Sequence, residues 1–111
     1  MVGKMNNMKI ELSILDRLTL IYILPTTGSI QELVDVMDII RLVRFTEEEK
    51  KAINYKEDNG KVTWNVDSET KKEVELTFEQ LKVIKDTINS LDKEGKITLN
   101  ILDTCLKFSK L

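Results

Sequence analysis

Residues 13–25, from Ser13 to Pro25, have the sequence SILDRLTLIYILP. Ser13 followed three residues later by Asp16 is a capping box, in which the hydroxyl accepts from a first-turn N–H and the carboxylate accepts from the N–H of the serine. Pro25 ends the apolar run because its ring does not fit a continuing helical turn. The stretch therefore predicts a helix over residues 14–24. Its apolar residues lie on nearly all sides, which is typical of a central helix or an interface helix.

The same start signal recurs three more times along the chain. The further pairs are Ser29/Glu32, Thr46/Glu49 and Thr77/Gln80. Each marks the beginning of a stretch with helical spacing or helical charge order, and Thr98 precedes one more. The sequence therefore predicts four further helices, over residues 30–43, 47–53, 78–91 and 99–108.

Alternation of apolar and polar residues replaces the helical spacing in the middle of the chain. Asn59 and Gly60 favour the two-residue turn of a β-hairpin, because a type I′ turn needs positive φ at both central positions. The apolar residues that share one face of this hairpin are Ile53, Tyr55, Val62, Trp64 and Val66. Residues 71–76 alternate again and offer a third strand.

These elements predict one α+β domain over residues 1–111. About five helices pack on a small antiparallel β-hairpin or three-stranded meander, which has one face on the helices and one in water. Residues 1–8 are expected to form a frayed or extended arm, because the apolar pattern begins after them.

The composition argues against an enzyme. The chain has no histidine, which removes the commonest general base and metal ligand. Cys105 is the only cysteine, so we expect no disulfide or thiolate metal cluster, and a buried side chain at this position. No glycine motif for phosphate binding occurs. We therefore expect no catalytic residue, no cofactor and no metal.

The charge balance gives no overall attraction to nucleic acid or to an anionic membrane, since the chain has 17 basic and 19 acidic residues. No apolar run approaches the length needed to span a bilayer, and residues 1–7 do not resemble a signal peptide. The expected location is the cytoplasm.

Arg17, Arg41 and Arg44 are the only arginines of the chain. Arginine is favoured where a planar carboxylate or a phosphate is recognised, and a hairpin of the first two helices would bring all three toward one end. A site for an acidic partner or a phosphate is one interpretation. The other is structural ion pairing with nearby acids, namely Asp35, Asp38 and the cluster at residues 47–49.

Trp64 and Tyr55 are candidate interaction residues of a second kind. Exposed aromatic side chains often dominate the binding energy of protein interfaces. The alternative is that Trp64 seals the sheet against the helices. Aromatic residues make up only 5% of the chain, too few for a platform that stacks single-stranded nucleic acid.

Three stretches support a family resemblance: Leu12 to Leu20 with the later Pro25 and Gly28, residues 45–49, and residues 62–65. Together they resemble small uncharacterised proteins that phages and prophages of Gram-positive bacteria encode. The likeness extends from about Lys9 to Phe108. It implies a phage context and carries no activity, cofactor or site residue.

We hypothesise a non-enzymatic phage accessory protein that binds a host or phage protein or associates with itself. The first two helices hold more apolar surface than a small monomer easily covers. One alternative is a nucleic-acid-binding regulator, with a helix-turn-helix-like bundle over the first three helices and the hairpin as a wing. Another is an oligomer that binds a small phosphorylated ligand through Arg17, Arg41 and Arg44.

Overall fold

The predicted α+β class is confirmed by the computed structural model, which describes residues 7–65 and 70–111. Within these residues the helices are α1 (Ile14–Ile23), α2 (Ile30–Val43), α3 (Glu47–Ala52), α4 (Phe78–Lys93) and α5 (Leu99–Ser109). The strands are β1 (Met8–Leu12), β2 (Lys56–Asp58), β3 (Lys61–Thr63) and β4 (Lys72–Leu76). Most of the expected arm and Val66 of the expected hairpin face lie outside the described residues.

All four predicted capping boxes form, with both hydrogen bonds in each. In the first box the Ser13 hydroxyl accepts from the N–H of Asp16 at 3.0 Å, and the Asp16 carboxylate accepts from the N–H of Ser13 at 3.0 Å. Each of these helices begins at the residue after its cap. Because the side chains satisfy N–H groups that a helix leaves free at its start, the boundaries are locally encoded.

The hairpin is also confirmed. Asn59 and Gly60 have φ values of 53° and 78°, as a type I′ turn requires, and β2 pairs with β3 in antiparallel register. Both strands are short and mostly exposed.

The expected third strand does not extend this hairpin, so the three-stranded meander is wrong. Instead β4 pairs with β1, with Ile10 opposite Val74 in a separate two-stranded antiparallel sheet. The reason is burial: β1 and β4 direct alternate apolar residues to the same side, where Leu12 and Leu76 are fully buried. Met8, the last residue of the expected arm, is the first residue of β1.

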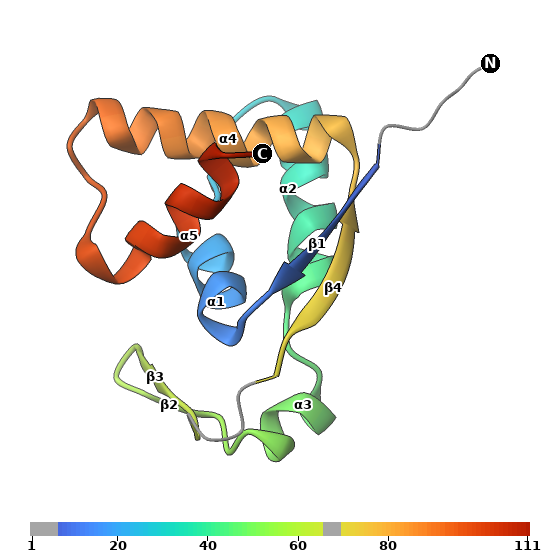
Figure 1. Ribbon diagram of the computed structural model, residues 1–111, viewed down its shortest axis with the longest axis vertical. Coiled ribbons are helices and arrows are strands. Elements are labelled where there is room, and N and C mark those ends of the chain that lie inside the picture. The colour runs from blue at the N-terminus through green and yellow to red at the C-terminus, as the bar shows by residue number, and fades with distance from the viewer. Residues whose placement is uncertain (1–6, 66–69) are drawn as a thin grey trace.

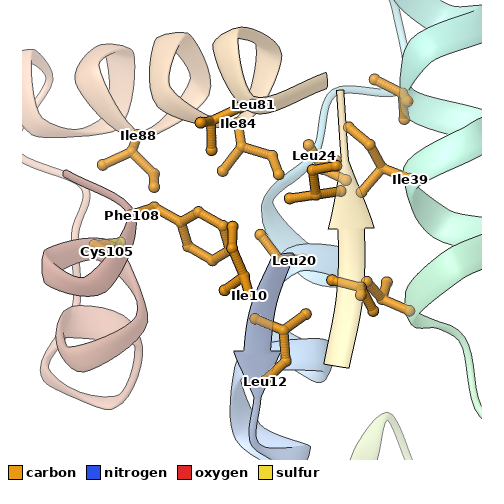
Figure 2. Close-up of a cluster of buried hydrophobic side chains, with 14 of the residues drawn as sticks. Ile10, Leu12, Leu20, Leu24, Ile39, Leu81, Ile84, Ile88, Cys105 and Phe108 are labelled. Atoms are coloured by element: carbon orange, nitrogen blue, oxygen red, sulfur yellow. The ribbon is translucent and has the colours of Figure 1, made fainter. Parts of the chain in front are cut away.

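One apolar core joins the two ends of the chain. Its members come from β1, β4 and four helices, and include Ile10, Leu12, Leu20, Leu24, Val36, Ile39, Val43, Val74, Leu76, Leu81, Ile84, Ile88, Ile101, Cys105 and Phe108. The Phe108 ring lies between β1, α1 and α4, with Ile88 on its α4 side (Figure 2). Cys105 is buried as predicted, and burial raises the pKa of its thiol.

The elements form two parts of unequal size. Helices α1, α2, α4 and α5 with the β1–β4 sheet make the body, and α3 lies with the β2–β3 hairpin at one end of it (Figure 1). We call residues 45–65 the α3–hairpin lobe. Within the lobe, the N–H of Asn65 donates to the carbonyl of Ile53 at 2.7 Å, which holds the hairpin against the end of α3.

Candidate functional site

Arg17 lies at the junction between the body and the α3–hairpin lobe, and only 1% of it is exposed. Its Nε donates to the carbonyl oxygen of Val43 and its Nη2 to that of Arg44, both at 2.8 Å. These carbonyls are among those that the end of α2 leaves without a helical partner. The guanidinium also donates two hydrogen bonds to the Glu49 carboxylate, from Nη1 to Oε2 at 2.8 Å and from Nη2 to Oε1 at 3.1 Å. Its central carbon stands 3.9 Å from the centre of the Phe45 ring.

This arrangement corrects one prediction about the arginines. Arg17 does not join Arg41 and Arg44 around a ligand, because its guanidinium is turned inward and occupied by the chain itself. The structural interpretation, ion pairing with the acidic cluster at residues 47–49, describes Arg17 as the structure has it. Glu49 thereby serves twice, as the capping residue of α3 and as the partner of Arg17.

The electrostatics of Glu49 predict a pH dependence of stability. The hydrogen bonds from Arg17, with a further one from Thr46, outweigh burial and lower the pKa of Glu49 from 4.5 to about 2. The unfolded chain therefore binds a proton at a higher pH than the native one does. We expect the contribution of Glu49 to stability to be complete above about pH 4.5 and lost as the pH falls toward about 2.

Urea denaturation across that pH window tests this expectation. The free energy of unfolding should rise with pH in the wild type, and Glu49→Gln should remove part of that slope. A slope unchanged by the substitution would show that the Arg17–Glu49 pair does not form in solution. The Glu57→Gln variant, at an exposed strand position, is the control and should keep the wild-type slope.

Asp16 is a second buried charge, and its sequence pattern predicts only the capping box with Ser13. Its Oδ1 accepts from the Thr104 hydroxyl at 2.6 Å, and its Oδ2 accepts from Nζ of Lys107 at 2.6 Å. Lys107 also donates to the carbonyl of Glu11 at 2.7 Å. Burial raises the pKa of Asp16, but the hydrogen bonds from Lys107, Thr104 and Ser13 outweigh it and hold the pKa below its usual value. This cluster ties α5 to the start of α1.

Arg41, on α2, and Arg44, the residue directly after its end, are by contrast exposed. They border a groove of about 520 Å³ beside the connector that follows α1. We call it the α2 groove; its lining residues are Pro25, Thr26, Leu33, Val36, Met37, Ile40, Arg41 and Arg44. Arg41 pairs loosely with Asp38 at 3.5 Å and approaches the sulfur of Met37 at 3.6 Å. An exposed pair of this kind contributes little energy, so Arg41 can exchange it for another partner.

The outer face of α2 is apolar over most of its length. Ile30 is 86% exposed and Met37 is 45% exposed, while Leu33 and Ile40 are half-buried. These residues follow one another at spacings of three and four, the pattern by which one helix packs along another. We call the four of them the α2 stripe. Val36, Ile39 and Val43, on the adjoining side of α2, are buried in the core, and Val36 also lines the α2 groove.

Helix α1 also exposes apolar groups, as its pattern predicted. Tyr22 is 81% exposed, and Leu15 and Ile21 are each more than a third exposed. A shallow hollow of about 160 Å³ lies between α1 and α5 beside Leu15 and Tyr22. The apolar surplus of the first two helices is therefore not sealed within one chain.

The two aromatic candidates lie in the α3–hairpin lobe and are half-buried. The Tyr55 ring packs against Phe45 at a centroid distance of 5.6 Å, and Nζ of Lys50 stands 5.3 Å from its centre. Trp64 has its Nε1 buried without an acceptor among the described residues. Tyr55 and Phe45 thus extend the packing that begins at Arg17, and neither aromatic candidate lies in the α2 groove.

The described residues also bear on other kinds of site. Within residues 7–65 and 70–111, no three acidic or thiol side chains gather in a way that could hold a metal ion. In the same part of the chain, none of the helices combines the length and the apolar character needed to cross a bilayer.

Comparisons of the chain with protein-family models, with curated proteins and with solved structures yield no match. The site must therefore be interpreted from its own geometry.

Proposed function

We propose that this protein is a non-enzymatic interaction protein that binds another protein, or a second copy of itself, through the outer face of α2. One observation carries the proposal: the α2 stripe is apolar and regularly spaced, and it leaves Ile30 and Met37 exposed on a helix whose adjoining side already belongs to the core. Such a face is the kind that a partner helix covers. The family resemblance adds only a phage context; within it we propose an accessory role in the cytoplasm of the bacterial host.

The nucleic-acid alternative has less support. Helices α2 and α3 are joined by only Arg44, Phe45 and Thr46, as a helix-turn-helix would require. However, α3 has six residues and three glutamates in its first turn, one of which is bound to Arg17. Phosphates would be repelled at the helix that should read the DNA. The phosphorylated-ligand alternative loses its third arginine, because Arg17 is occupied.

Light scattering on the chromatographed protein, followed by capture from a bacterial host lysate, tests the proposal. We expect an assembly larger than a monomer, or a captured protein, that disappears in Met37→Asp. The reason is that the interface would bury an unpaired aspartate at the centre of the stripe, and the free energy lost by removing this charge from water exceeds the free energy of the contact. Leu106→Asp is the matched control, since Leu106 on α5 is also 45% exposed. A strict monomer without a captured protein would contradict the proposal, and so would a partner retained by Met37→Asp.

A further inference from the structure

We infer that the occupant of the α2 groove is an acidic amphipathic helix of another protein. The inference rests on the proposed function and names the chemistry of the partner. Its basis is the distribution of charge around the groove, which combines an apolar floor with cations at one end only.

The floor and the rim of the groove differ in character. Leu33, Met37 and Ile40 form an apolar surface along one side of α2, and Arg41 and Arg44 stand at its C-terminal end. Arg41 lies in the last turn of α2, and Arg44 is the C-cap residue directly after the helix. No carboxylate is among the described residues that line the groove. A complementary partner therefore offers a leucine-rich stripe with Asp or Glu beside it at one end.

A second copy of α2 fits this surface less well. In an antiparallel pair centred on Met37, Arg44 of one copy lies beside Ile30 of the other and Arg41 lies beside Leu33, so each arginine is opposite an apolar residue. In a parallel pair, Arg44 faces its own counterpart. Glu32 does not supply the missing acidic partner for these arginines, because its carboxylate accepts from the N–H of Ser29 in its own helix cap. Charge complementarity thus favours a different, acidic chain.

A nucleic acid fits less well still. Its phosphates would meet two arginines and then an apolar floor, which offers nothing to replace the water they lose. A continuous basic track is the usual footprint of such a ligand, and the arginines here occupy one end of the groove only.

Two stapled helical peptides of about two heptads test the inference. Both carry leucine at the a and d positions; one has glutamate at the flanking positions, and the other has lysine. Fluorescence anisotropy gives the affinities, and shifts of backbone amide resonances locate the binding. We expect the acidic peptide to bind about tenfold more tightly than the basic one and to shift the resonances of α2.

Two variants and one control sharpen the result. The double variant R41E/R44E should reverse the preference between the peptides, because only the rim charge changes. Met37→Asp should weaken both peptides. The control K82E/K85E reverses two lysines on α4, outside the α2 groove, and should leave the preference unchanged.

The failures of the inference and of the proposed function are distinguishable. Equal affinity for both peptides would overturn the inference that an acidic helix occupies the groove. Tighter binding of a DNA or RNA oligonucleotide that shifts the same α2 resonances would overturn it too. A dimer that Met37→Asp dissociates, with neither peptide bound, would overturn it as well and leave the proposed function standing. A monomer that binds no protein and neither peptide would overturn both.

Discussion

Replacement of Arg17 by methionine is expected to lower the free energy of unfolding by about 3–5 kcal/mol. The variant leaves the carbonyls of Val43 and Arg44 without their donor, and it leaves the Glu49 carboxylate without its partner. Methionine keeps much of the volume of the arginine stem, so the loss reports mainly on hydrogen bonds and charge. Chemical denaturation at neutral pH measures it.

Two further variants isolate the cause of that loss. Arg41→Met removes an exposed arginine from the same fold and should change the stability by less than about 0.5 kcal/mol. In the double variant R17M/E49Q, part of the loss should be recovered, because no unpaired charge remains at the junction. If Arg17→Met lowers the free energy of unfolding by less than about 1 kcal/mol, which is the contribution of an exposed ion pair, the claim that Arg17 makes buried stabilising contacts at the junction is contradicted.

Asp16→Asn is expected to be the second most damaging of these changes, at about 2–3 kcal/mol. The amide has the size of the carboxylate but carries no charge. Its oxygen can still accept from the N–H of Ser13 and from Lys107, but its NH₂ group then faces the Thr104 hydroxyl, which donates to Asp16 in the wild type and would have to accept instead. The hydroxyl proton loses its acceptor there, and the ion pair between Lys107 and Asp16, which joins α5 to α1, is lost. Thermal and urea denaturation both report the change.

Glu32→Gln is the matched control, since Glu32 holds the same capping position in α2. It is exposed, and its carboxylate serves the cap without the tertiary hydrogen bonds that Asp16 makes. Glutamine performs the same task at Gln80, so the control should cost less than about 0.5 kcal/mol. Equal losses for Asp16→Asn and Glu32→Gln would mean that the contacts to Thr104 and Lys107 add nothing.

Local signals explain why the sequence predicted so many boundaries. A capping box places its two partners three residues apart, and the Asn59–Gly60 turn places them side by side, so each can be recognised within a short window. The first residues of the helices after Ser13, Ser29, Thr46 and Thr77 follow from such windows. The apolar spacing of α1 and α2 likewise predicted the exposed surplus on these helices.

Contacts between distant parts of the chain could not be found in the same way. β1 and β4 are separated by three helices and the hairpin, and nothing in either strand specifies the other beyond a shared alternation. The inward turn of Arg17 depends on where α2 ends and α3 begins in space. Asp16 meets Thr104 and Lys107 only because α5 packs on α1. In the sequence, Arg17 cannot be told from the exposed Arg41, nor Asp16 from the exposed Glu32. The difference between them arises only from the packing of the helices.

Photo-crosslinking from the α2 stripe tests the central claim most directly. Benzoylphenylalanine replaces Met37 in one chain and Leu106 in another, two positions with the same exposed fraction of 45%. The chains are produced in a Gram-positive bacterium, the host that the proposed function implies, and are irradiated there. The account predicts a covalent adduct with a protein from position 37 and none from position 106. Adducts at neither position, or equally at both, would contradict the assignment of the outer face of α2 as the interaction surface.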